Sequence, residues 1–324
     1  MTLRASVVVP TFRRPELLGR CLTALLRQRL DAGQFEIVVA DDAAEESTRC
    51  QVQLLAAATS ISLRYIPVTG NHGPAAARNA GWHSCGGEII AFTDDDTIPD
   101  SAWLTQGLAA FERDADVMAV AGQTEVPLPT NPTDYERNES GLAGAEFITA
   151  NCFVRRRALE EVGGFDERFR SAWREDSDLE FALLERGMKI VNAPSAVVVH
   201  PVRPAPWGVC LSMQRKSQYD ALLFKKHPEF YRRRIRPGPP RRYYTAVASL
   251  LAALVFALAG SQLGSLLAGG VWLLLTGQFT VIRLRRNSLA PAHVAEMILT
   301  SAVIPPLSVF WRLYGAAKFR TIFF

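Results

Sequence analysis

The sequence predicts an α/β fold with a mainly parallel sheet and flanking helices, followed by long apolar helices near the carboxyl end. Two observations lead to this prediction. Short β-branched or apolar runs alternate with helical stretches through the first 100 residues, a rhythm typical of parallel strands joined by right-handed crossovers. Near the carboxyl end, residues 243–282 contain no Asp, Glu, Lys, Arg or His. Those 40 residues are long enough for two membrane spans of about 20 residues each.

The elements of the first half follow from local patterns. β-branched runs predict strands, and Pro15 stands where it can open an amphipathic helix with Leu18, Leu22 and Leu25 on one face. A second helix is expected over residues 45–58, and a third, rich in alanine, follows Gly73-Pro74. The expected strands lie at residues 5–9, 35–40, 62–66 and 89–92. In such sheets ligands bind beyond the carboxyl ends of the strands.

The fourth strand, Ile89 to Phe92, ends in the three carboxylates Asp94, Asp95 and Asp96. Three like charges at the end of a buried strand repel each other unless a counter-charge is present. A divalent cation that also holds phosphate oxygens would supply it. The alternative is a solvated acidic turn, but the position at the carboxyl edge of the sheet favours the metal.

Two common nucleotide-binding motifs are absent. The first strand is followed by Pro10-Thr11-Phe12-Arg13-Arg14 and not by Gly-x-Gly-x-x-Gly, and no Gly-Lys-Ser/Thr phosphate loop occurs. The segment from Gly73 instead predicts a helix N-terminus that can face an anion, with Arg78 one turn inside the helix. A different nucleotide-binding fold is therefore indicated.

Four segments in order resemble the nucleotide-sugar motifs of glycosyltransferase family 2, whose fold is GT-A. They are Ser6-Val7-Val8-Val9-Pro10-Thr11, Val38-Val39-Ala40-Asp41-Asp42, Gly73-Pro74-Ala75-Ala76-Ala77-Arg78-Asn79 and Phe92-Thr93-Asp94-Asp95-Asp96. The chain departs from the family at Ala40 and Ala43-Ala44, where the family often shows Val-Asp-Asp followed by Gly/Ala-Ser, whereas the second aspartate is retained as Asp42. The resemblance implies that Thr11, Asp42 and Arg78 hold the nucleoside and diphosphate. It further implies that Asp94 and Asp95 contact the nucleotide and that Asp96, with Asp94, binds Mg²⁺ or Mn²⁺.

A second acidic pair, Glu175-Asp176, precedes Ser177 and Glu180. The spacing of Ser177 and Glu180 is that of a capping box, so we expect a helix to begin there and the acidic pair to project from the preceding loop. Transfer of a sugar to a hydroxyl needs a base that takes the hydroxyl proton. The pair resembles the Glu-Asp motif of inverting family members, which implies that Asp176 is the base and Glu175 its neighbour. The alternative is a pair of ordinary anions near a helix dipole.

Two further observations concern the last strand and the segment after it. His200 follows the apolar run Val197 to Val199, and the resemblance implies that it lies near the metal and diphosphate; a structural histidine is the alternative. Processive relatives would show Gln-x-x-Arg-Trp near Gln214, but this chain reads Gln-Arg-Lys-Ser-Gln-Tyr. Polymer synthesis is therefore not expected.

Charge divides the chain into three parts. Residues 1–202 carry 19 Lys/Arg against 29 Asp/Glu, residues 203–242 carry 11 against 2, and residues 243–324 carry 6 against 1. The basic charge is local, which excludes a nucleic-acid-binding surface spread over the acidic globular part. Arginines flank the uncharged run on both sides, so the positive-inside rule places both ends of the apolar hairpin in the cytoplasm. No secretory signal is visible, and the tail from His293 is expected to be interfacial or re-entrant.

We therefore expect a GT-A catalytic domain at residues 1–202, with a nucleotide-sugar half at 1–100 and an acceptor half at 101–202. A basic amphipathic neck at 203–242 and membrane-anchoring helices at 243–324 would follow. The expected activity is inverting transfer of one sugar from a nucleoside diphosphate-sugar to a hydroxyl of a lipid-linked or cell-surface glycan precursor, at the cytoplasmic face of the inner membrane. The alternatives are transfer to a polyprenyl phosphate and, from another class, a sugar nucleotidyltransferase or a tethered binding module.

Overall fold

A computed structural model describes residues 3–323 of the chain. The chain forms two compact units. The first, the catalytic unit, comprises the residues up to Pro127 together with Ser140–Val202, and the second, the helical unit, comprises Leu128–Glu139 and the residues from Arg203 onward. Sequence analysis did not separate Leu128–Glu139 from its neighbours in the catalytic unit.

The catalytic unit contains one mixed sheet of eight strands among the described residues, in the order β3-β2-β1-β4-β7-β6-β8-β5. β1, β2, β3 and β4 run parallel to one another, whereas β7 is antiparallel to both of its neighbours. The carboxyl ends of β1, β2 and β4 therefore meet at one edge. The strands are β1 (Ala5–Thr11), β2 (Phe35–Asp41), β3 (Ser62–Pro67), β4 (Ile89–Phe92), β5 (Ile98–Pro99), β6 (Val117–Glu125), β7 (Cys152–Arg155) and β8 (Lys189–Val199).

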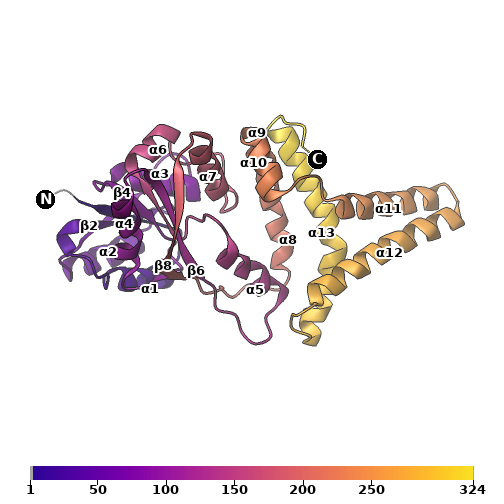
Figure 1. The fold of residues 1–324 in the computed structure, drawn as a ribbon. Coiled ribbons are helices and arrows are strands. Elements are labelled where there is room, and N and C mark those ends of the chain that lie inside the picture. The colour runs from indigo at the N-terminus through magenta and orange to yellow at the C-terminus, as the bar shows by residue number, and fades with distance from the viewer. Residues whose placement is uncertain (1–2, 324) are drawn as a thin grey trace. The chain divides into compact units, whose positions relative to one another are not determined.

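Helices cover both faces of this sheet (Figure 1). Val7 and Val9 of β1 pack in one apolar cluster with side chains of α1 and α4, whereas Val8 packs in a second cluster with Trp82 of α3. This alternation is the two-residue period of a strand, and it explains why the central strands are apolar throughout. The helices and helical turns of the unit are α1 (Pro15–Leu25), η1 (Ala32–Gln34), α2 (Glu46–Ala57), α3 (Pro74–Ser84), α4 (Trp103–Arg113), η2 (Ser140–Gly144), α6 (Arg156–Val162) and α7 (Glu175–Glu185).

The predicted start of α7 was wrong. The helix begins at Glu175, two residues before Ser177, and its N-cap Arg174 has left-handed backbone angles (φ 77°) and makes no side-chain cap hydrogen bond. The backbone N–H of Ser177 instead donates to the Asp176 carboxylate at 2.7 Å. Burial overrides the capping signal here, because the Glu175 side chain is held among buried partners of the catalytic unit. Glu175 and Asp176 therefore belong to the first turn of the helix and not to a loop before it.

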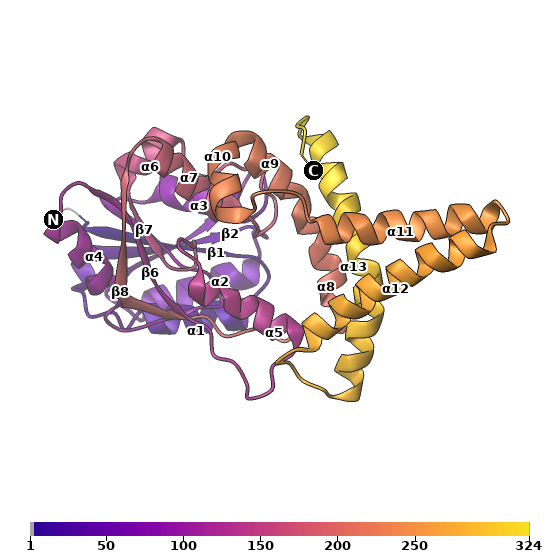
Figure 2. The same ribbon diagram turned by 45° about the vertical axis from the view of Figure 1, so that its right-hand side comes forward.

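The helical unit contains the short helices of the neck and three long apolar helices. α11 and α12 form an antiparallel hairpin around Gly260, whose positive φ of 75° suits the turn (Figure 2). All three long helices are long and apolar enough to cross a membrane. The elements are α5 (Asp134–Glu139), α8 (Val209–Met213), η3 (Gln214–Ser217), α9 (Gln218–Lys226), α10 (Pro228–Phe230), η4 (Tyr231–Ile235), α11 (Arg241–Leu258), α12 (Gln262–Leu284) and α13 (Pro291–Lys318).

Candidate active site

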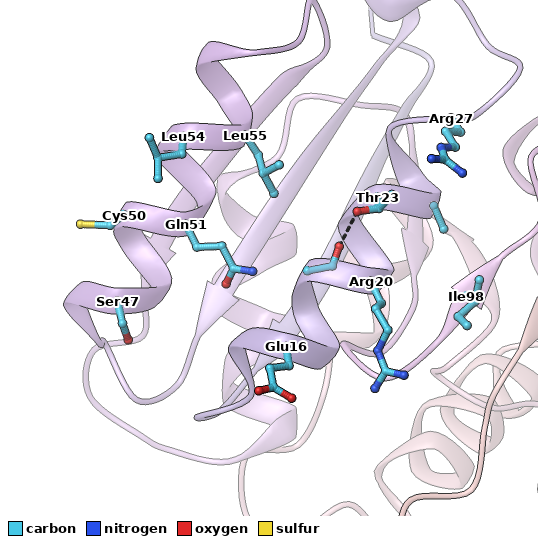
Figure 3. Close-up of a pocket in the computed structure, with 12 residues that line it drawn as sticks. Glu16, Arg20, Thr23, Arg27, Ser47, Cys50, Gln51, Leu54, Leu55 and Ile98 are labelled. Atoms are coloured by element: carbon cyan, nitrogen blue, oxygen red, sulfur yellow. Dashed lines mark hydrogen bonds between the residues drawn. The ribbon is translucent and has the colours of Figure 1, made fainter.

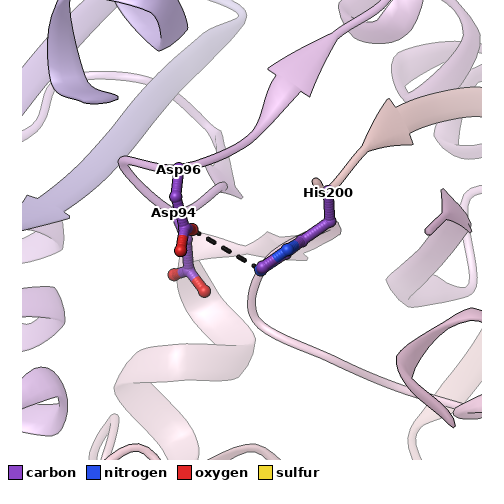
Figure 4. Close-up of side chains that lie close together, drawn as sticks. All are labelled: Asp94, Asp96 and His200. Atoms are coloured by element: carbon purple, nitrogen blue, oxygen red, sulfur yellow. Dashed lines mark ion pairs between the residues drawn. The ribbon is translucent and has the colours of Figure 1, made fainter. Parts of the chain in front are cut away.

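Three potential metal ligands from distant parts of the sequence meet at the carboxyl edge of the sheet. Asp94 and Asp96 lie in the loop after β4, and His200 follows β8; one ligand atom of each lies within 4.8 Å of the others (Figure 4). His200 Nε2 lies 3.5 Å from Asp96 Oδ1. His200 is held in place by its backbone N–H, which donates to the carbonyl of Glu125 at 2.8 Å. Two carboxylates and one imidazole suit Mn²⁺, and Mg²⁺ through the oxygens.

The middle carboxylate, Asp95, accepts hydrogen bonds from the end of β1 and from the loop that follows β1. Thr11 Oγ1 donates to Asp95 Oδ2 at 2.7 Å, and Arg14 donates to Oδ1 at 3.1 Å. Burial raises the pKa of Asp95 to about 6, although Arg14 and Thr11 oppose that shift. Asp95 thus ties the acidic loop to the end of β1. Sequence analysis missed Arg14, because a pair of arginines in a loop does not by itself identify a partner.

Arg78 joins the acidic loop to the acidic pair of α7. Its side chain is buried, and its two terminal nitrogens donate to Asp94 Oδ1 at 2.7 Å and to Glu175 Oε1 at 3.1 Å. Burial opposes the charged form, but the carboxylates of Asp94 and Glu175 outweigh it and raise the pKa of Arg78. In the same way, burial would raise the pKa of Asp94, but Arg78 and His200 lower it below its usual range.

Glu175 and Asp176 lie side by side but in different surroundings. Glu175 is buried, and its second oxygen accepts the backbone N–H of Trp173 at 2.6 Å. Burial and the neighbouring Asp176 charge raise the pKa of Glu175 to about 7, against the effect of Arg78. Asp176 remains partly exposed, and burial raises its pKa, although the N–H of Ser177 and the guanidinium of Arg174 act in the opposite direction. Asp176 is therefore the carboxylate of the pair that an incoming group can reach.

Asp42 lies at the end of β2 but makes a different set of contacts. Its carboxylate accepts the backbone N–H of Gly73 at 2.9 Å and lies 3.0 Å from His72 Nδ1. It therefore holds the loop that leads into α3. The preceding Asp41 caps its own turn, accepting the N–H groups of Ala43 and Glu45. Asp41 is fully buried, whereas the Asp42 side chain keeps some exposure at this edge.

Asn79 is a second residue that sequence analysis did not assign. Its amide nitrogen donates to the carbonyl of Phe165 at 2.8 Å and to Glu167 Oε1 at 3.0 Å, and its oxygen accepts the N–H of Phe165 at 2.9 Å. Gly164 (φ 70°) lies so close that a Cβ would be 2.7 Å from the Asn79 oxygen. Asn79 thus fixes the loop after α6 against α3, beside Arg78.

A groove of about 860 Å³ lies elsewhere on the catalytic unit, between α1 and α2. It is lined by residues such as Arg20, Gln51 and Leu54 (Figure 3). None of the residues assigned above to the donor, metal or base lines it. The candidate site is therefore defined by the carboxylate clusters at the sheet edge and not by this groove.

The fold and this edge define a class: an α/β enzyme that handles a nucleotide-sugar at the carboxyl ends of its strands. The sequence profile described as glycosyl transferase family 2 matches residues 6–164, and that described as glycosyl transferase family group 2 matches residues 89–314. The chain belongs to glycosyltransferase family 2, and its fold is GT-A.

Individual relatives agree with this assignment. The chain is 28% identical to glycosyltransferase AglE of Haloferax volcanii over 61% of its own length and 67% of that protein. It is 31% identical to the pre-mycofactocin glycosyltransferase of Mycobacterium tuberculosis over 69% of its own length and 48% of that protein. The chain thus spans about half to two thirds of the length of these relatives.

A solved structure shares the fold. The mannosyltransferase PcManGT of Pyrobaculum calidifontis, in complex with GDP-Man and Mn²⁺, superposes with a TM-score of 0.56 at 20% identity, covering 99% of this chain and 88% of that one. That homologue therefore binds both a nucleotide-sugar and Mn²⁺. In the present chain, Asp94, Asp96 and His200 form a donor set whose chemistry fits such an ion.

Proposed function

We propose that this protein is a membrane-anchored, metal-dependent, inverting glycosyltransferase that moves one sugar from a nucleoside diphosphate-sugar to a hydroxyl acceptor. The acceptor is proposed to be a lipid-linked or cell-surface glycan precursor. One observation carries the proposal: Arg78 bridges Asp94 of the metal-type cluster and Glu175, the neighbour of the accessible Asp176. A donor site and a carboxylate base are thereby joined through one buried side chain.

The proposed roles follow from chemistry and position. Asp94, Asp96 and His200 would hold Mn²⁺ or Mg²⁺, which stabilises the negative charge of the departing diphosphate. Thr11, Asp42 and Arg78 would hold the nucleoside and diphosphate, and Asp95 would order the loop that carries the metal ligands. Residues 1–100 would thus bind the donor, and residues 101–202 would supply the base and bind the acceptor.

Asp176 is proposed as the general base. Inverting transfer requires a carboxylate that accepts the hydroxyl proton as the oxygen attacks the anomeric carbon. The buried Glu175 is bonded to Arg78 and to the backbone of Trp173, so it positions the first turn of α7, whereas Asp176 stays partly exposed. Transfer to a polyprenyl phosphate is the second candidate. Its acceptor is already an anion and needs no base, so the Glu175-Asp176 pair favours a hydroxyl.

The long apolar helices support membrane attachment. Leu254 and Val255 of α11 and Leu266 of α12 are each more than half exposed, which is a favourable surface only in contact with lipid. Positive charge flanks the hairpin on both sides, which supports a cytoplasmic catalytic unit at the inner membrane. The family membership favours a transferase over a nucleotidyltransferase or a binding module.

The replacement Asp176→Asn tests the proposed base. Asn keeps the shape of the side chain but cannot accept the proton, so turnover is expected to fall about 10²–10⁴-fold. Donor affinity should stay nearly unchanged, because the donor is held by other residues, and this pattern marks a contact made mainly in the transition state. Turnover and calorimetric donor affinity, measured on the same full-length preparation, separate the two effects.

Asp178→Asn is the comparison variant, because Asp178 lies in the same first turn of α7 but is buried and cannot reach an acceptor. It is expected to lower stability while leaving the turnover of the folded protein near normal. If Asp176 acted only on the helix dipole, Asp176→Asn would likewise lower stability slightly and leave turnover similar. Near-normal turnover of Asp176→Asn would remove Asp176 from the mechanism and would favour a phosphate acceptor.

A further inference from the structure

The helix α13 differs from α11 and α12 in how much of its surface is covered by protein. In an apolar stretch of 18 residues in α13, 39% of the residues are buried, against 6% in the corresponding stretches of α11 and α12. The three helices are alike in being long and apolar, but α13 is covered by protein to a greater extent than α11 and α12. α13 therefore has a protein-facing side that runs along much of its length.

Much of that side is covered by the neck, which follows α13 in the same direction, and the rest by α11 and α12. The N–H of Gly208 donates to the Glu296 carboxylate at 2.8 Å, and Asp220 pairs with Arg312 at 3.2 Å. Further on, the ammonium of Lys225 donates to the carbonyl of Phe319 at 2.8 Å. Between the first and the last of these contacts α13 rises roughly 35 Å, at about 1.5 Å per residue.

The neck and α13 approach each other closely at Gly315. Gly315 packs against the backbone of Gln218, and a Cβ at this position would lie 2.3 Å from the Gln218 carbonyl oxygen. Arg312 and Asp220 are both buried, so the ion pair is enclosed between the two segments. The neck and α13 therefore form one packed layer and would have to occupy the same depth in a membrane.

Because the neck and α13 would have to lie at the same depth, α13 cannot span the bilayer. A contact of roughly 35 Å is longer than the hydrocarbon core of about 30 Å. If α13 crossed the bilayer, the neck would cross beside it and carry Arg215, Lys216 and Lys225 through the hydrocarbon, at a high energetic cost. Arg215 and Lys225 are exposed and not enclosed by protein.

The opposite side of α13 is apolar and exposed. Tyr314 is near the end of this side, and aromatic residues of this kind favour the headgroup region. Helices with one charged, protein-bound side and one apolar side lie in the plane of the membrane surface. The large exposed apolar residues of α13 are Ile298, Leu299, Val303, Phe310, Leu313 and Tyr314.

We infer that α13 lies along the surface of an anionic lipid bilayer, with its apolar side in the headgroup–acyl boundary and the neck helices α8 and α9 on its aqueous side. The exposed Arg232, Arg233 and Arg234 of η4 supply the complementary charge for anionic headgroups. This inference rests on the proposed anchoring of the protein by the α11–α12 hairpin. It requires that residues 319–323 and the catalytic unit lie on the same side of the membrane.

Labelling with a membrane-impermeant maleimide in sealed vesicles tests the inference on the full chain. The exposed native Cys50 reports the side of the catalytic unit. In a background that carries Cys50→Ser, Cys85→Ser and Cys210→Ser, Ile322→Cys reports the segment after α13, and Ser261→Cys reports the turn of the hairpin. We expect residue 322 to be labelled from the side on which Cys50 is labelled, and residue 261 only from the opposite side.

Labelling of residue 322 from the side of residue 261 would show that α13 spans the bilayer and would overturn the inference while leaving the hairpin intact. Labelling of residue 261 from the side of Cys50, or extraction of the protein by alkaline carbonate, would instead overturn the anchoring and the inference with it. These two failures are distinguishable in one experiment.

Nitroxide depth measurements provide a second test. Spin labels at Leu299 and Phe310, eleven positions apart on one side of α13, should report the same shallow depth in vesicles that contain anionic lipid. A label at Leu254 of α11 is the control and should lie deeper. Depths of the two α13 labels that differ by a large part of the hydrocarbon thickness, or loss of lipid accessibility through contact with a second copy, would contradict the inference.

Discussion

At the scale of single residues, the candidate site balances two of its three clustered carboxylates with arginines. Arg14 pairs with Asp95 and Arg78 with Asp94, whereas Asp96 faces His200. The repulsion that led us to predict a metal is therefore partly relieved by the protein itself. The proposed metal ion would therefore act more on the diphosphate than on the stability of the fold, and Asp96 is the carboxylate on which its binding should depend most.

We therefore predict that Asp96→Ala abolishes the effect of Mn²⁺ on donor binding. The reason is that a hard divalent ion loses one of two carboxylates in its proposed donor set. Calorimetric titration of the full-length protein with a nucleoside diphosphate, with and without Mn²⁺, measures this. Asp42→Ala is the comparison: it should weaken binding through the loop at Gly73 while the response to Mn²⁺ persists. Unchanged Mn²⁺-dependent affinity of Asp96→Ala would contradict the metal assignment.

A second prediction concerns pH. Burial raises the pKa of Asp176, and that of its neighbour Glu175 to about 7, and a base works only when ionised. Turnover should therefore rise as pH increases beyond the usual carboxylate pKa of about 4 and then level off. Glu175→Gln removes the negative charge beside Asp176, which should lower the pKa of Asp176 and move the rise in turnover to lower pH. A pH–rate profile without any rise above pH 5 would show that the pair does not act as a coupled base.

The sequence predicted which residues form this site better than it predicted the hydrogen bonds and ion pairs between them. Asp94 and Asp96 could be proposed as metal ligands because they follow an apolar strand, whose end lies at the ligand-binding edge of a parallel sheet. His200 was proposed from the family resemblance. The bridge from Arg78 to Glu175 could not be predicted, because it joins residues 97 positions apart and depends on the packing of α3 and α7. Arg14 and Asn79 were missed for the same reason, since only the folded chain brings them to Asp95 and Phe165.

At the scale of elements, the helices and strands followed their local signals except where a tertiary contact competed. The strands of the first half lie where β-branched runs predict them, and Pro15 and Pro74 open α1 and α3. The capping signal at Ser177 failed because Glu175 is drawn into the first turn of α7 by Arg78 and the N–H of Trp173. A propensity worth about 1 kcal/mol loses against such buried contacts.

The close packing of α3 on β1 gives a prediction for Gly81. A Cβ at Gly81 would lie 2.4 Å from Val8 Cγ1, so Gly81→Ala should force the helix away from the strand and destabilise the catalytic unit by about 1–3 kcal/mol. Gly33→Ala is the control, because a Cβ there meets nothing within 4 Å. The midpoint of thermal unfolding, measured for both variants, should fall only for Gly81→Ala. Equal midpoints would mean that this contact does not fix α3 on the sheet.

At the scale of the whole molecule, Leu128–Glu139 is the unexpected feature, because it leaves the catalytic unit between β6 and β7 and belongs to the helical unit. Asp134 of this segment pairs with Arg283 near the end of α12 at 2.8 Å. Arg283 directly follows the uncharged run of residues 243–282, but its side chain is buried and also donates to Thr300 and Ser301 of α13. Arg285 and Arg286 therefore remain as the flanking charges at this end of the hairpin.

The pair between the buried Arg283 and the partly exposed Asp134 leads to the last prediction, which a double-mutant cycle tests. Asp134→Asn leaves the enclosed Arg283 without its counter-ion and should destabilise the helical unit by about 1–3 kcal/mol. Arg283→Met leaves Asp134 without its cation and should be similarly harmful. The double variant removes both charges, so its loss of stability should be clearly smaller than the sum of the two single losses. Unfolding of the full-length protein in detergent micelles gives the three values. Additive losses would show that the two side chains act independently and that the pair does not hold Leu128–Glu139 to α12.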